Sequence, residues 1–184
     1  MAVAFPDDPR PLPHFHSKRL ALDLPLPDGH AWRIDDHTRP ELVATHAPTQ
    51  STVSVATFRA DAVVGRDQCE ALARERHLVP SGDLRTLESS VEITQDDYDT
   101  RVWVALEPGS GPDRPLVGHV MAFGGFLRKC YAFDFSTRVD SSADEDVLSA
   151  RLAFARARIL GGLRLGTSTE IPREAPPEPA APAP

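Results

Sequence analysis

Hydrophobic and polar residues alternate over most of this chain, a period of two that is typical of β-strands with one buried face. The clearest case lies between Pro115 and Val139. Its second half places Tyr131, Phe133, Phe135 and Val139 on one side. The first half, 116–123, is apolar enough to pair beside it, and Gly124-Gly125 predicts the tight turn between the two. We expect this hairpin to form the centre of a sheet.

The same alternation predicts further strands on both sides of one helical segment. They cover residues 20–26, 32–34, 42–45 and 51–60 before the helix, and 87–93 and 101–106 after it. Residues 66–77 switch to helical spacing, with Cys69, Leu72 and Ala73 on one face. This segment is therefore predicted to be a short amphipathic helix.

A second helix is expected after the hairpin. Ser142 and Glu145 have the spacing of a capping box, in which each side chain satisfies a backbone N–H group at the helix start. One apolar stripe follows, made of Leu148, Leu152, Ala155 and Ile159. Gly161-Gly162 is expected to end the helix, which would cover the sheet.

The resulting order, ββββ-α-ββββ-α, predicts an α+β fold: an antiparallel sheet of about six to eight strands with two packed helices. Residues 1–16 are rich in proline and predict an extended or disordered arm. Residues 17–166 form the predicted single domain, and the Pro/Ala-rich residues 167–184 a disordered tail.

Four stretches have the element order and the pattern of residue types of a known group of folds. They are LALDLPLPDGHAWRI, STVSVATFRA leading into RDQCEALARERH, and GHVMAFGGFLRKCYAFDFSTRV before the last helix. Over about residues 17–165 the chain resembles the PsbP-like and DcrB-like α/β sandwiches. Members of that group mostly bind, chaperone or assemble other proteins. The resemblance therefore implies a non-catalytic role, and it transfers no catalytic residue.

Composition narrows the classes of partner. The net charge of −7 and the pI near 5.4 argue against a nucleic-acid backbone or an anionic membrane surface as the main partner. No apolar run is long enough to span a bilayer, and the first residues lack the features of a secretory signal. We expect a cytoplasmic protein of a bacterium with a GC-rich genome, with a removed signal peptide as the open alternative.

Candidate catalytic and metal-binding patterns are weak. Cys69 and Cys130 are far apart and lack a CxxC spacing, so buried free thiols are expected. Cys130 and His119, on paired strands, are the nearest approach to a nucleophile and base. His14-Phe15-His16 supplies two imidazoles, fewer than a metal needs. We predict no catalytic residue, no metal site and no cofactor.

A mixed sheet face is the predicted partner-binding site if the helices leave it open; the alternative is that the other helix covers this face. It would hold Phe58, Glu92, Trp103, His119 and Met121. The function inferred is a non-catalytic protein-binding module, as a chaperone, an immunity-type inhibitor or an assembly adaptor. The partner would be another protein, and an edge strand near Trp32 could also pair two copies of the chain.

The alternative function belongs to a different class of protein. In it, the chain is a small-molecule-binding or hydrolytic domain whose early loops form the site. His30, Asp36, His37 and His46 would then have to converge around a pocket.

Overall fold

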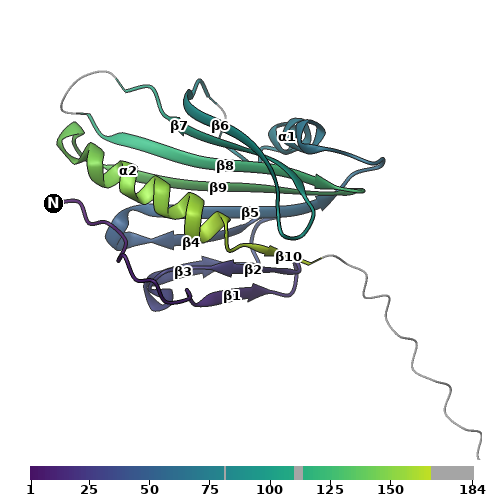
Figure 1. Ribbon diagram of the computed structural model, residues 1–184, viewed down its shortest axis with the longest axis horizontal. Helices are drawn as coiled ribbons and strands as arrows, with labels where there is room; N and C mark the ends of the chain where they lie inside the picture. Colours follow the sequence, from purple (N-terminus) through teal and green to yellow (C-terminus); the bar gives the residue numbers. More distant parts are fainter. Residues whose placement is uncertain (81, 110–113, 167–184) are drawn as a thin grey trace, which may run out of the picture.

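The computed structural model describes residues 1–80, 82–109 and 114–166, and its main element is an antiparallel sheet of seven strands (Figure 1). In spatial order the strands are β3 (Trp32–Asp35), β4 (Leu42–His46), β5 (Ser51–Arg59), β9 (Lys129–Val139), β8 (Leu116–Phe126), β7 (Asp99–Leu106) and β6 (Arg85–Ile93). Two helices pack on this sheet. The predicted fold class, an α+β fold with an antiparallel sheet, is confirmed.

The predicted hairpin does occupy the middle of the sheet. β9 is the central strand, and Phe133 lies opposite Val55 on β5 and Ala122 on β8. Its aromatic side chains are fully buried. Burial of aromatic residues of this size is among the largest contributions a single side chain makes to a core, which explains why β8 and β9 organise the sheet.

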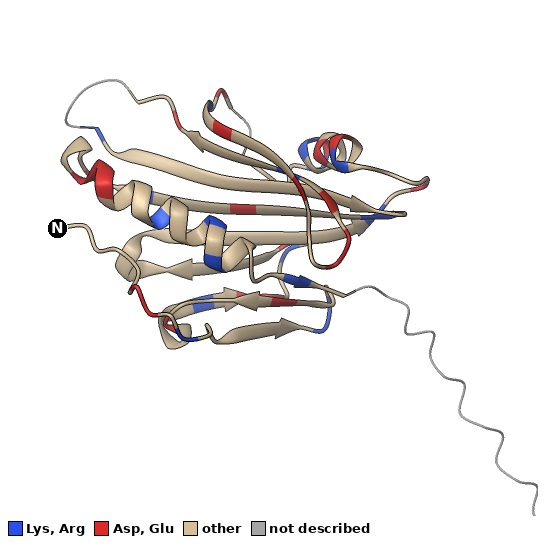
Figure 2. Cartoon of the chain, viewed as in Figure 1, with Lys and Arg blue, Asp and Glu red and all other residues tan. Residues whose placement is uncertain are grey.

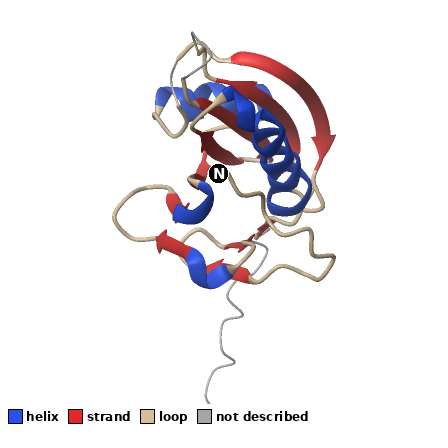
Figure 3. Ribbon diagram, turned by 90° about the vertical axis from the view of Figure 1, so that its left-hand side faces the viewer, coloured by secondary structure: helices blue, strands red, loops and turns tan. Residues whose placement is uncertain are grey.

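Each face of the sheet carries one helix. α2 (Glu145–Phe154) continues as a π-helical segment, Ala155–Leu160, and its predicted apolar stripe is buried. Figure 3 shows the sheet curving around α2. α1 (Arg66–Glu75) packs on the other face, against β8 and β9. The Ser141 hydroxyl accepts a hydrogen bond from the Ala143 N–H and caps the 3-10 turn Ser142–Asp144 that leads into α2.

A buried arginine fastens α2 to the sheet. The guanidinium of Arg151, whose side chain is 2% exposed, donates hydrogen bonds to the carbonyl oxygens of Val3, Thr49 and Arg138 and to the Thr137 hydroxyl. Burial lowers the pKa of Arg151, partly offset by the charge of Asp144. Four acceptors from distant parts of the chain are thereby satisfied by one cation.

The first predicted strand is not part of the seven-stranded sheet, so the expectation that it would pair there was wrong. β2 (Leu22–Pro25) lies between β1 (His14–Ser17) and β10 (Arg164–Leu165) in a separate three-stranded sheet. Short 3-10 turns at Gly29–Ala31, Ala47–Thr49 and Ser142–Asp144 complete the described elements. β2 lies apart from the main sheet because its alternate leucines are buried under the C-terminal end of the second helix.

The N-terminal segment contributes to the core. Phe5 is 8% exposed and lies 5.0 Å from the Phe154 ring and 6.3 Å from Trp32, measured between ring centroids. The predicted tail at 167–184 lies outside the described residues. Among the residues described, no helix is long and apolar enough to cross a bilayer.

The turn between β8 and β9 was predicted at the wrong place. Gly124 and Gly125 are buried inside β8, and the chain reverses at Leu127, whose φ is 54°. A Cβ at Gly124 would come within 2.2 Å of the Tyr131 ring, and one at Gly125 within 2.7 Å of the Val64 carbonyl. These glycines therefore permit close packing in a strand instead of forming the turn.

The expectation of free thiols was also wrong. Cys69 on α1 and Cys130 on β9 form a disulfide across a sequence separation of 61, with their Cα atoms 5.4 Å apart. The sequence could not show this, because pairing depends on α1 docking over one end of β9. The bond ties α1 to the central strand.

Candidate protein-binding surface

The residues of the predicted binding site divide between the two faces of the sheet. Trp103 and Met121 are paired neighbours on β7 and β8, and His119 and Phe58 share their face, which is the face of α1. Glu92 lies on the opposite face. The structure thus brings four of the five residues to one side.

Two of these residues are buried and offer no contact area. Met121 is 3% exposed and packs with Ala73, Ala105, Phe123 and Ala132 in a small core beneath α1. His119 is 2% exposed. Both side chains therefore support the surface from below and cannot themselves touch a partner.

His119 lies between two carboxylates. Its Nδ1 is 3.0 Å from Asp134 Oδ1 and its Nε2 is 3.0 Å from Glu107 Oε1. Burial by itself lowers the pKa of His119, but the hydrogen bonds and negative charges of Asp134 and Glu107 outweigh burial and raise it above the ordinary value. A protonated imidazole donates to both carboxylates, which makes this cluster an internal clamp between β7, β8 and β9.

The two aromatic residues flank α1 and are half-buried. The Trp103 indole N–H donates to Glu70 Oε2 on α1 at 3.2 Å, and the Arg101 guanidinium lies 5.4 Å from the ring centroid. The Arg76 guanidinium stacks over Phe58 at 4.7 Å. Each ring is held in place by a charged neighbour, so the edges that remain exposed are rigid.

Glu92 has a different role. The Arg156 guanidinium, at the end of the second helix, lies 3.5 Å from Glu92 Oε2 and 2.8 Å from the Ser90 hydroxyl. Arg156 also approaches Glu88 Oε1 at 3.7 Å. These contacts join β6 to the end of the second helix.

Three exposed large apolar side chains occur together on β6, on which the predicted site included only Glu92. β6 is an edge strand, and Leu87, Val91 and Ile93 are 50%, 52% and 65% exposed. Val91 and Ile93 share the face of Trp103. The alternation of 87–93 predicts a strand with one buried face, but neither face of β6 is buried, because it is the edge strand and α1 packs on β7, β8 and β9.

The early loops do not form a pocket of converging ligands. Asp36 binds the Arg19 guanidinium at 3.1 Å, and Asp35 caps the backbone N–H groups of His37 and Thr38. His46 is buried, with its Nδ1 2.8 Å from the Thr49 hydroxyl. Within 1–80, 82–109 and 114–166, no three His, Cys, Asp or Glu side chains form a metal-binding group. The geometry required by the alternative reading is therefore not found there.

The proposed pair of Cys130 and His119 is ruled out by register. His119 lies opposite Ser136 and Cys130 opposite Gly125, six residues further along β8. At about 3.3 Å per residue these positions are roughly 20 Å apart. Cys130 is in addition consumed by the disulfide.

No family model matches the chain, and no curated protein does. Solved structures do: the yeast Ran-binding protein Mog1p has a TM-score of 0.57 at 7% identity, covering 83% of this chain and 94% of its own. Cyanobacterial PsbP from Synechocystis has a TM-score of 0.52 at 11% identity, covering 85% of this chain and 93% of its own.

The chain has the PsbP-like α/β fold. The resemblance of element order is thereby confirmed at the level of fold. A protein from Bacteroides thetaiotaomicron also matches, with a TM-score of 0.52 and 12% identity over 88% of this chain. This chain spans about half, 51%, of that protein's length. At these identities the PsbP-like likeness establishes the fold alone.

Proposed function

We propose that this PsbP-like domain is a non-catalytic module that binds another protein through the free edge of β6. The observation that carries the proposal is the exposure of this strand, on which Val91 and Ile93 are more than half exposed beside Trp103. Exposed apolar side chains on an unpaired edge are a liability that folded proteins normally avoid, so their presence here indicates use.

The unpaired backbone of β6 determines what kind of partner segment can bind there. The outer backbone N–H and C=O groups of an edge strand pair only with another extended chain, as in β-strand addition. An irregularity in the pairing at Leu87 interrupts the ladder, so the regular stretch runs from 88 to 93. A partner strand of about six residues fits this length.

The side chains on the two faces of β6 add selectivity. Val91 and Ile93 lie on the face of Trp103, whereas Glu88 and Glu92 lie on the other face. Successive residues of a strand point to opposite faces. The partner strand would therefore place apolar residues beside Val91 and Ile93, and polar residues on the face of the two glutamates, which Arg156 already contacts. Mog1p is described as Ran-binding, which gives a precedent for protein recognition on this fold.

The compartment is part of the same proposal. A disulfide such as Cys69–Cys130 persists in oxidising surroundings and is uncommon in a reducing cytoplasm. The cytoplasmic location was predicted together with free thiols at both cysteines, and the disulfide removes that support. We now propose that the module works in an oxidising compartment of a bacterial cell, as a chaperone, an immunity-type inhibitor or an assembly adaptor.

The test compares two variants of equal chemistry in affinity capture from the native host. Val91→Lys introduces a charge on the β6 edge, and Val63→Lys introduces the same charge at another exposed valine, 72% exposed. We expect the wild type and Val63→Lys to retain one stoichiometric protein, and Val91→Lys to lose it.

Hydrogen exchange on the captured complex identifies the surface directly. The outward amides of residues 88–93 should exchange quickly in the free chain and slowly in the complex. Retention of the partner by Val91→Lys, with unchanged exchange on β6, would refute the edge as the binding site. If the slowed exchange comes from a second copy of this chain, the module is a homodimer and the adaptor role is wrong.

A further inference from the structure

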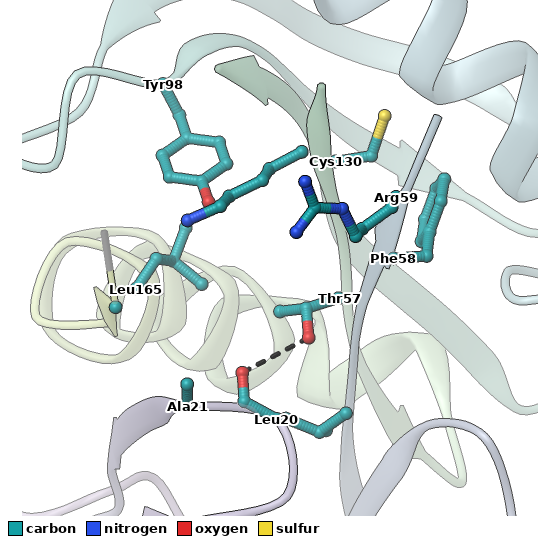
Figure 4. A pocket seen from close by; sticks show the side chains of 10 residues that line it. Leu20, Ala21, Thr57, Phe58, Arg59, Tyr98, Cys130 and Leu165 are labelled. Atoms are coloured by element: carbon teal, nitrogen blue, oxygen red, sulfur yellow. Dashed lines mark hydrogen bonds between the residues drawn. The ribbon is translucent and has the colours of Figure 1, made fainter. Parts of the chain in front are cut away.

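A small pocket lies at the end of the sheet where β5 ends and β9 begins. It has a volume of about 180 Å³, room for several water molecules at ~30 Å³ each. The lining comes from β5, β9, the β7 approach and the small sheet, as Figure 4 shows. Its apolar wall is formed by Leu20, Ala21 and Leu165.

Two cations line the pocket and face each other. Arg59 and Lys129 are direct cross-strand partners on β5 and β9 and lie on the same face of the sheet. Directly opposed like charges destabilise a pair of strands. Neither cation forms an ion pair with any residue in the described ranges. In Figure 4 the Arg59 guanidinium points into the space between Tyr98, Leu165 and Thr57.

A tyrosine hydroxyl completes the polar part of the pocket. Tyr98 is 3% exposed, and its ring packs against Phe126 and Tyr131. Its hydroxyl points into the pocket in Figure 4 and makes no hydrogen bond to another residue of the described chain. The hydroxyl oxygen is not among the buried side-chain atoms that lack a hydrogen-bond partner in the described residues, so it is open to the pocket and free to donate to a ligand.

The Tyr98 hydroxyl is available to the pocket as a hydrogen-bond donor. Burial and the charge of Asp96 raise the pKa of Tyr98 to about 12, which keeps its hydroxyl protonated as a donor. Asp96 itself accepts a hydrogen bond from the Leu165 N–H at 2.8 Å and is engaged there. At this end of the molecule Figure 2 shows basic residues at the start of β9 and on β10, with acidic residues on the neighbouring β6–β7 connection and on the loop after β5.

We propose that this pocket binds a small monocarboxylate with a short apolar chain. The carboxylate lies between Arg59 and Lys129 and accepts a hydrogen bond from the Tyr98 hydroxyl. Its chain lies along Leu20 and Leu165. A carboxylate satisfies all three donors at once and removes the repulsion between the two cations, whereas the apolar wall selects against a bare inorganic anion. This site is separate from the β6 edge and does not depend on it.

The test is calorimetric titration of the full-length protein with sodium hexanoate, with acetate and 1-hexanol as comparison ligands. Hexanoate should bind with one-to-one stoichiometry. Acetate lacks the chain and hexanol lacks the charge, so each should bind at least about tenfold more weakly.

Matched charge variants locate the site. Arg59→Gln and Lys129→Gln should each weaken hexanoate binding about tenfold or more, because each removes a charged hydrogen-bond donor. Arg128→Gln removes the same charge from the adjacent turn and should change affinity less than about twofold. Tyr98→Phe should weaken binding severalfold and leave the fold intact, since only an unpaired hydroxyl is lost.

The unliganded variants supply a second measurement. Arg59→Gln should unfold at the same or a higher urea concentration than the wild type, because it relieves like-charge repulsion. The proposal is wrong if no member of the carboxylate series saturates the protein. It is equally wrong if Arg128→Gln weakens binding as much as Arg59→Gln, since binding would then reflect net charge alone.

Discussion

The disulfide between Cys69 and Cys130 should be the largest single covalent contribution to stability. α1 buries only Cys69 and Ala73 among its ten residues, so little apolar area holds the helix on the sheet. The bond closes a loop with a sequence separation of 61. Chain-entropy arguments place the stabilisation from closing a loop of this length at about 4 kcal/mol.

This figure can be measured by urea unfolding of the wild type and of Cys69→Ala/Cys130→Ala. We expect the free energy of unfolding to fall by about 4 kcal/mol, a large fraction of the ~5–15 kcal/mol typical of a domain. Alanine at both positions avoids leaving a free thiol. Reduced wild type should behave like the double variant, which separates the bond from the loss of side-chain volume.

The order in which parts of the structure open without the disulfide is a sharper test of its role. Without the bond, hydrogen exchange should speed up first in α1, and the small core around Met121 should become accessible before β9 does. A loss below about 1 kcal/mol, with α1 amides as protected as before, would refute the reasoning. It would mean that side-chain packing, and not the cross-link, holds the helix.

Three further perturbations test other parts of the fold. Arg151→Met leaves three buried carbonyls without their cation and should cost about 3–5 kcal/mol in urea unfolding, with Arg151→Lys recovering only part. His119, with a raised pKa, contributes stability that is full below the unfolded pKa of about 6.5 and is lost as pH rises through the folded pKa. His46 has the opposite sign: burial, the main cause, lowers its pKa despite the charge of Asp28, so its contribution is lost as pH falls below about 6.5. NMR titration should place the pKa of His119 above, and that of His46 below, this value; equal values would contradict the burial and charge argument. Gly124→Ala should cost about 1–3 kcal/mol through overpacking, whereas Gly109→Ala, with its nearest contact at 3.9 Å, should be neutral in the same thermal unfolding experiment.

Local pattern was sufficient for most of the elements. The alternation of 51–60, 87–93 and 101–106 marked strands that are present at those positions, and helical spacing marked α1. The aromatic side of β9 identified the central strand, because only a strand covered on that face can bury so many rings. These features depend on neighbours within a few residues, and such neighbours are visible in a sequence.

The binding surface depended on long-range geometry. Glu92 was placed on the wrong face, because the register of the β6–β7 hairpin pairs it with Thr100 and puts Val91 and Ile93 on the face of Trp103. His119 and Met121 were predicted as surface residues, but α1 and the carboxylates around His119 bury them. A mixed composition of one strand face does not reveal which element packs on it.

By itself, therefore, the sequence determined the element types, the central hairpin, the apolar stripe of the second helix and the class of fold, since each follows from local periodicity. Tertiary structure alone decided the pairing of Cys69 with Cys130, the separate small sheet around β2, and the meeting of Arg59, Lys129 and Tyr98 in one pocket. The physical reason is the same in each case. These contacts join residues tens of positions apart, and their partners are chosen by how helices and strands dock, which no local pattern encodes.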